Sequence, residues 1–414
     1  MSEAPAAPRR PWRRLAAAVT AAVLALLVLR TFVARAYRVT TASMEPTILG
    51  AAAGPDGGVA FDGERVLVTF GVGELERFDL VVVDRGGDAP FVKRVAGLPG
   101  ESVRVLDGDL LVDGRGLAAD APRPAPVELF DSTRDAVAEH FHFRQAPEGP
   151  WHAADDGTLE LDGTAVPPGS DLGMLLLHKE LRDGYRRHDG SLEPGVHAVG
   201  DGGLVVAFRL GDPATVLRVR LVEEGDLFEL TIGPRAEPPD GDAAAEPDRP
   251  RELVLRRDPG GEVLARTPLA LGSAGGGGWH RLVFDNVDNH LRALVVDAAG
   301  DERVQLTATY DGNRPYNGVL PEDRTSVAPR VAVGGEGGPL TLGRIRVTRD
   351  LHLLAVGTHA VDRVLDLGPD EVFLVGDNSA DSADSRLWGP VPLRDLIGRP
   401  LAVIGPSDRW RVLR

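Results

Sequence analysis

Residues 37–47 read YRVTTASMEPT, and this stretch leads out of an apolar segment into a proline-containing turn. It places one serine, Ser43, in that turn. A serine hydroxyl is a poor nucleophile unless a neighbouring base removes its proton. The function of the stretch therefore depends on whether the rest of the chain supplies a base. Without one, Ser43 is only a turn residue.

The segment before this stretch is first basic and then apolar. Four arginines within residues 9–14 precede the apolar run 15–29, which continues less strictly to Tyr37. About 23 residues of helix span roughly 34 Å, which is enough to cross a bilayer. We predict a retained transmembrane anchor at 15–36 and a cytoplasmic basic N-terminus at 1–14. The run 15–29 also has the length of a cleaved signal peptide, and the Arg-Arg pair allows a twin-arginine signal.

The composition favours short strands over helices. The 414 residues include 50 glycines and 32 prolines and few aromatic residues, a mixture typical of strands joined by many turns. This length suits two domains. Cysteine is absent, which excludes disulfides and a cysteine nucleophile. The net charge of −16 argues against a nucleic-acid partner, and no nucleotide or HExxH motif is present, so we expect no cofactor.

Several strands are predicted after Ser43. Apolar runs at 64–69, 79–83 and 91–95 follow the small-residue loop 51–58. Residues 102–106 and 109–112 flank an Asp-Gly pair that is typical of a β-hairpin turn.

Lys93 lies inside the strand predicted at 91–95, where the ordinary interpretation is an exposed lysine. However, only Lys93 and Lys179 among the 46 basic residues are lysines. Arginine does not deprotonate in a protein, whereas a desolvated lysine can act as a base. Its pKa would have to fall from about 10.4 to about 7–8, which burial can achieve. All ten histidines lie within residues 140–359, which favours a serine–lysine pair over a triad containing histidine.

A polar loop, GDNSADSADSR at 376–386, follows a strand predicted at 371–375. Alternating aspartate and asparagine oxygens would suit calcium, but the spacing and terminal glutamate of an EF-hand are missing. We therefore predict no metal site in the chain.

Three stretches occur in order: SMEPT at 43–47, KRVAGLPGE at 93–101, and the loop at 376–386. Together with the preceding apolar segment they resemble the type I signal peptidases, which are membrane-anchored serine–lysine proteases. The resemblance covers roughly residues 9–115 and 351–405. It implies a β-rich catalytic core, removal of N-terminal signal peptides after Ala-x-Ala-like sites through an acyl-enzyme, and a plasma-membrane location with the catalytic part outside the cytoplasm. The implied partners are preprotein signal peptides and the lipid bilayer.

The resemblance also assigns roles to individual residues. Ser43 is implied as the nucleophile and Lys93 as the general base, while the Thr41 hydroxyl and the Ser43 N–H would form the oxyanion hole. Ser382 would orient the lysine, and Asp384 and Arg386 would form a structural ion pair. The implied substrate pocket is lined by four apolar residues: Val39, Met44, Ile48 and Val92. Two positions depart from the family pattern, since Thr40-Thr41-Ala42 replaces the usual Pro-Ser-Gly and Ser379 stands where many members have arginine.

The middle of the chain is a long insertion of predicted strands. They lie at 204–210, 216–222, 227–232, 279–284, 291–296 and 342–347, and several alternate apolar and polar residues. The pattern resembles a concanavalin-like β-sandwich. Its acidic residues and histidines lack metal-ligand spacing, and the sequence does not identify a ligand for it.

The sequence thus predicts a mainly β protein with one N-terminal transmembrane helix and a large inserted sandwich. The expected parts are 1–14, the anchor 15–36, catalytic core 37–119, insertion 120–350 and catalytic core 351–414. The leading interpretation is a membrane-bound signal peptidase. A membrane-tethered envelope binding protein with an inactive protease core is the alternative, and a secreted sandwich lectin would leave the three motifs unexplained.

Overall fold

The computed structural model describes residues 16, 19, 20 and 34–413, with gaps at 88, 107, 144–148, 178, 224–225, 236–250, 259–260, 272–277 and 311–329. The described chain is mainly β and divides into two compact units. The first contains residues 1–104, 112–114 and 356–414, and the second contains residues 105–111 and 115–355.

The predicted anchor falls mostly outside the described residues. Residues 34–36, which the sequence assigns to its end, instead lie in strand β1 and pair with β4. Within the described ranges, no helix combines the length and the apolar character needed to cross a membrane.

The first unit is organised around an antiparallel sheet in the order β1-β4-β29-β5-β6-β27-β28, with β30 paired to β29. These strands are β1 (Ala34–Arg38), β4 (Arg65–Phe70), β5 (Leu80–Val83), β6 (Phe91–Gly97), β27 (Glu371–Val375), β28 (Val391–Pro392), β29 (Leu396–Gly405) and β30 (Arg411–Val412). Shorter strands of this unit are β2 (Ala52–Ala53), β3 (Val59–Phe61) and β26 (Leu365–Asp366). The hairpin β7 (Ser102–Leu106) and β8 (Asp109–Val112) follows β6, and its residues 105–111 belong to the second unit.

Alternation along the strands explains why both faces of this sheet are covered. Val66, Leu80 and Val82 pack in one apolar cluster, whereas Val81 and Val83 pack in another. Successive side chains of a strand point to opposite faces, so the all-apolar β5 contributes to both clusters. The sheet therefore holds its central strands, β5 and β6, rigidly.

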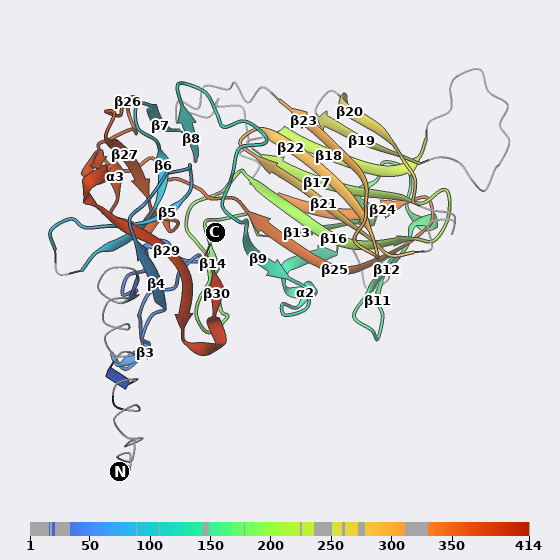
Figure 1. Cartoon of the computed structure of the whole chain (residues 1–414). Coiled ribbons are helices and arrows are strands. Elements are labelled where there is room, and N and C mark those ends of the chain that lie inside the picture. Colours follow the sequence, from blue (N-terminus) through green and yellow to red (C-terminus); the bar gives the residue numbers. More distant parts are fainter. Residues whose placement is uncertain are drawn as a thin grey trace, which may run out of the picture. The chain divides into compact units, whose positions relative to one another are not determined.

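The second unit consists mainly of two antiparallel sheets (Figure 1). One has the order β10-β13-β24-β17-β18-β19-β20, and the other has the order β11-β12-β25-β16-β21-β22-β23, with β9 paired to β25. The first contains β10 (Phe141–Phe143), β13 (Met174–Leu177), β17 (Val216–Glu223), β18 (Asp226–Pro234), β19 (Arg251–Asp258), β20 (Glu262–Leu269) and β24 (Arg330–Glu336). The second contains β9 (Val127–Asp131), β11 (Trp151–Ala153), β12 (Leu159–Asp162), β16 (Gly202–Leu210), β21 (His280–Val287), β22 (His290–Asp297), β23 (Glu302–Thr309) and β25 (Pro339–Arg349).

The two sheets share one hydrophobic core. Phe208 and Phe284 of one sheet and Phe228 of the other belong to the same buried cluster. The second unit also contains a short helix, α2 (Val137–His140), and the hairpin β14 (Tyr185–Arg186) and β15 (Leu192–Glu193). All six strands predicted for the insertion are present. The unpredicted strands are β9 to β15, β19, β20, β23 and β24.

Candidate active site

Ser43 lies in η2 (Ala42–Met44), a single 3-10 turn that follows β1. The carboxylate of Glu45 accepts a hydrogen bond from Gly50 N at 3.0 Å, which closes the loop after the turn. Gly50 packs on the carbonyl oxygen of Thr41 so closely that a Cβ would collide with it. These contacts hold Ser43 in a defined position with only 6% of its surface exposed.

Lys93 projects from the middle of β6, where its backbone pairs with Val81 of β5. Its side chain is completely buried. The Nζ atom lies 2.7 Å from Ser43 Oγ and 3.2 Å from Ser382 Oγ. The fold thus brings together three side chains that the sequence places in three separate motifs.

Burial lowers the pKa of Lys93 to about 8. Desolvation is the largest cause, and the nearby Asp384 and Asp377 carboxylates oppose it by favouring the charged ammonium. The positive charge of Arg386 lowers the pKa of Lys93, in the same direction as burial. A lysine with this pKa is neutral in roughly a tenth of molecules at pH 7, so it can accept a proton near neutral pH.

A polar loop between β27 and α3 (Ser385–Trp388) carries Ser382. The backbone N–H of Asn378 in this loop donates to Ser43 O at 3.1 Å. A Cβ at Gly376 would collide with both Ser382 Oγ and Ser43 O, so a glycine is required at that position. The loop therefore fixes Ser43 and Ser382 relative to each other.

Asp384 and Arg386 form the ion pair that the family resemblance implies. Arg386 Nε donates to Asp384 Oδ1 at 2.9 Å and Nη2 donates to Oδ2 at 2.8 Å, and both side chains are almost completely buried. Arg386 also donates to the hydroxyl and to the carbonyl oxygen of Ser379. Ser379, which replaces the arginine of many family members, is therefore part of the same network.

A second buried ion pair was not anticipated from the sequence. Arg94, next to Lys93 on β6, donates to both carboxylate oxygens of Asp377, at 2.7 Å and 2.6 Å. Its Nη1 donates to Phe78 O at 2.7 Å. A bidentate arginine–carboxylate contact fixes geometry as well as charge. This pair ties β6 to the loop that carries Ser382, and the available signal was an arginine inside an apolar strand.

The Thr41 hydroxyl lies on the exposed side of the turn, with its Oγ1 3.4 Å from Ser43 Oγ. The family resemblance assigns this hydroxyl, together with the Ser43 N–H, to the oxyanion hole. That role remains a prediction.

The four predicted pocket residues share one apolar cluster. Met44 and Ile48 are buried to 1% and 0% exposure, and Val39 is 9% exposed. Val92 is only partly buried against this cluster. Met44 and Ile48 therefore lie in the core in this structure, and any contact with substrate by the four residues remains a prediction.

One histidine lies closer to the polar loop than its sequence position suggests. The His359 N–H donates to Arg386 O at 3.0 Å, and its ring packs on Gly389. In the part of the chain that the structure describes, however, Ser43 Oγ and Lys93 Nζ form hydrogen bonds with each other, with Thr41 and with Ser382. His359 is therefore a neighbour of the loop and not a partner of the serine.

Comparison with known families settles the classification. The model of the family described as "Signal peptidase, peptidase S26" matches residues 12–168 and 343–404, which is just over half of the chain. The chain belongs to the peptidase S26 family. The matched segments of this S26 protein contain every residue of the site described above, and residues 169–342 lie between them.

Curated relatives agree with this assignment. The chain is similar to signal peptidase I of Bacillus licheniformis, with 38% identity over 105 residues that cover 24% of this chain and 48% of the relative. It is also similar to signal peptidase I S of Bacillus subtilis strain 168, with 37% identity over 127 residues, covering 29% of this chain and 61% of the relative. The chain spans about half the length of the curated relatives it matches.

Solved structures give weaker similarities. A Bacillus subtilis protein of unknown function with a galectin-like fold matches with a TM-score of 0.35 and 11% sequence identity, covering 55% of this chain and 98% of that one.

Proposed function

We propose that this protein is a serine endopeptidase that removes N-terminal signal peptides from exported preproteins. The observation that carries the proposal is the 2.7 Å contact between Ser43 Oγ and Lys93 Nζ, in which the lysine is buried and its pKa is lowered to about 8. Membership of the S26 family and similarity to proteins named signal peptidase I support the same conclusion.

In the proposed reaction, neutral Lys93 accepts the proton of Ser43 as Oγ attacks the scissile carbonyl carbon. The tetrahedral oxyanion accepts hydrogen bonds from Ser43 N–H and from the Thr41 hydroxyl. Collapse breaks the C–N bond, and the leaving amine takes the proton from Lys93. Water then attacks the acyl-enzyme with Lys93 again as base, which releases Ser43 and the signal peptide carboxylate.

Ser382 is proposed to orient Lys93. Its hydroxyl is 3.2 Å from Nζ, and the position of its loop depends on the two buried arginine–aspartate pairs. A base that is already held in one rotamer presents its lone pair to Ser43. Its side chain then needs no reorientation that would raise the activation free energy.

The proposal also covers the cleavage site and the cellular location of the protein. Cleavage after Ala-x-Ala-like sites would follow from shallow apolar contacts near Val39 and Val92. We propose a single-pass location in the plasma membrane, with the anchor at 15–36 and the catalytic unit outside the cytoplasm. Substrates would then be met while their own signal peptides hold them at the bilayer.

The second unit includes residues 120–350, the range predicted as an insertion, and the bounds of that insertion remain a prediction. Its two sheets around one core support the sandwich interpretation, and we propose that it contacts a ligand, a substrate or an envelope partner. We assign it no catalytic activity.

Cleavage of a preprotein with an Ala-x-Ala site by the purified full chain tests the proposal. We expect the Ser43→Ala and Lys93→Ala variants each to lose activity by at least about 10³-fold, because the two residues act as a unit. Ser407→Ala and Lys179→Ala change the same residue types at exposed positions and should retain full activity. The rate should rise with pH to a midpoint of about 8.

Two outcomes would contradict the proposal. Cleavage that survives Ser43→Ala or Lys93→Ala would exclude the serine–lysine mechanism. A folded wild-type chain that cleaves no preprotein would favour the alternative of a membrane-tethered binding protein with an inactive core.

A further inference from the structure

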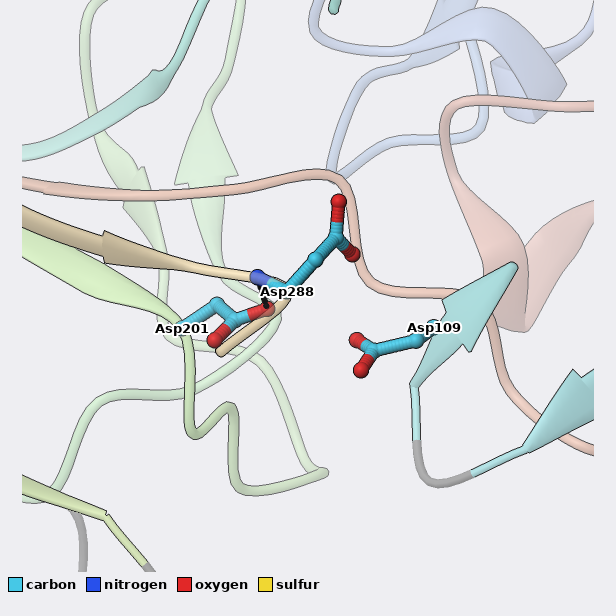
Figure 2. Close-up of side chains that lie close together, drawn as sticks. All are labelled: Asp109, Asp201 and Asp288. Atoms are coloured by element: carbon cyan, nitrogen blue, oxygen red, sulfur yellow. Dashed lines mark hydrogen bonds between the residues drawn. The ribbon is translucent and has the colours of Figure 1, made fainter. Parts of the chain in front are cut away.

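A group of three aspartates in the second unit lies outside the site described above. Asp109 begins β8, Asp201 directly precedes β16, and Asp288 lies in the turn between β21 and β22. One carboxylate oxygen from each lies within 4.8 Å of the other two (Figure 2). The sequence predicts no metal site here, because only the fold brings these distant positions together.

The backbone holds the three residues in place. Gly202 and Asn286 pair across β16 and β21, which sets Asp201 and Asp288 at the same end of the sheet. The Asp288 N–H donates to Asp201 Oδ2 at 3.0 Å. On the other side, Gly108 O accepts a hydrogen bond from Leu353 N at 2.8 Å, which fixes the hairpin end that carries Asp109.

The second oxygen of Asp201 has no such partner. Asp201 Oδ1 is inaccessible to solvent and accepts no hydrogen bond from the described residues. Figure 2 shows the Asp109 carboxylate turned toward the Asp201 side chain. Leaving a buried carboxylate oxygen unpaired is costly, so native structures normally satisfy such an atom with a donor, water or ion.

The surrounding charge is also unbalanced. Arg123 donates to Asp288 Oδ2 at 2.9 Å and 2.7 Å and neutralises one carboxylate. Glu223 adds a further negative group, which accepts hydrogen bonds from Asn286 and Tyr310. The remaining carboxylates lie close together and repel one another at this range. A cation at the centre of the group would remove that repulsion.

We propose that Asp109, Asp201 and Asp288 bind a divalent cation of the calcium type. Calcium–oxygen distances of about 2.3–2.6 Å place two ligands of one ion at most about 5 Å apart, which agrees with the observed oxygen separation. The group contains only carboxylate oxygens, which suit a hard cation, whereas zinc prefers histidine or cysteine. Asp288 would contribute the oxygen that Arg123 leaves available, and carbonyl oxygens or waters would complete the coordination.

Such an ion would cross-link three segments of the second unit: the start of β8, the start of β16 and the β21–β22 turn. Because it binds the folded chain only, it should raise the unfolding temperature. This effect does not depend on proteolysis, so it can be tested separately from the proposed function.

Thermal unfolding and calorimetric titration of the EDTA-treated full chain test the site. We expect calcium chloride at about 1 mM to raise the melting temperature of the wild type by about 5 °C and magnesium chloride to have a much smaller effect. Asp201→Asn should abolish the calcium response and should raise the melting temperature measured without calcium, because it relieves repulsion. Asp301→Asn removes the same charge from an exposed position and should respond like the wild type.

Three results would overturn the proposal. The first is the absence of both a titration heat and a melting shift when calcium is added to the wild type. The second is an equal calcium response in the wild type and in Asp201→Asn, which would place the ion elsewhere. The third is an equal response to magnesium and calcium, which would exclude a calcium-type site. If Asp201→Asn does not fold, Asp109→Asn replaces it in the same comparison.

Discussion

The two clusters of buried ionisable side chains balance their charges differently. Beside Lys93, the buried Arg94 meets Asp377 in a two-point contact within the chain itself. Around Asp201, carboxylates face one another, and Arg123 pairs with one member of the group. The first cluster is neutralised within the chain, whereas we propose that a bound cation neutralises the second.

This difference in charge balance suits the two clusters to different roles. A network of matched pairs holds side chains in one geometry, which a proton transfer between Ser43 and Lys93 requires. A group of like charges stores repulsion that ligand binding can release. Burial therefore serves positioning in one unit and, as we propose, ligand binding in the other.

Breaking the Arg94–Asp377 pair should have the largest effect on stability. Arg94→Met leaves Asp377 buried without its partner and should cost about 3–5 kcal/mol of unfolding free energy. Denaturant unfolding measures this loss. Replacing both partners, as Arg94→Met with Asp377→Leu, should recover most of it, because no buried charge then remains unpaired.

A matched surface pair provides the control. Arg38 contacts Asp62 at 2.7 Å, but their side chains are 53% and 56% exposed. Arg38→Met should therefore cost less than about 1 kcal/mol. If Arg94→Met lowers the unfolding free energy no more than Arg38→Met does, the buried Arg94–Asp377 pair contributes no more to stability than an exposed ion pair.

Sequence reasoning identified the candidate catalytic residues beside the first cluster, but not its Arg94–Asp377 pair. Ser43, Lys93 and Ser382 each lie in a short characteristic stretch, and the strands at 102–106 and 371–375 agree with the structure residue for residue. Arg94 and Asp377 lay inside the same motifs, yet their pairing depends on how β6 and β27 are aligned. His359 likewise reaches the loop only through the fold.

The second cluster left no comparable signal. Asp109, Asp201 and Asp288 each occupy a turn or strand end, where aspartate is common for local reasons. Strand pairing alone brings them together. Strands β19 and β23 were missed for a related reason: the exposed face of each carries polar residues such as Arg256 and Gln305 that weaken the apolar signal.

The burial of Lys93 also makes the stability of the protein depend on pH. Its pKa is lowered from 10.5 to about 8, so the folded chain binds fewer protons there than the unfolded chain between these values. The charged lysine therefore costs about 3 kcal/mol below pH 8, and the cost disappears as the pH rises from 8 to 10.5. Lys93→Met should stabilise the protein by about this amount at pH 7 while abolishing cleavage.

Unfolding of Lys93→Met and wild type across this pH range checks the sign. The stability difference should be largest below pH 8 and should shrink toward pH 10.5. Lys179→Met, at an exposed position, should show no such trend. A difference that grows with pH, or a destabilised Lys93→Met, would mean that the lysine is held in its charged form and is paired like Arg94.

The smallest expected effect concerns the exposed edge of the first cluster. Thr41 Oγ1 lies 3.4 Å from Ser43 Oγ, at the exposed edge of the buried network. If it donates to the oxyanion, Thr41→Val should lower kcat by about 10²-fold with little change in stability, whereas Thr41→Ser should restore activity. Thr40→Val, one residue earlier and also exposed, is the matched control and should leave kcat unchanged. Equal rates for Thr41→Val and Thr40→Val would assign the oxyanion to backbone donors alone, because a valine of the same shape removes only the hydroxyl.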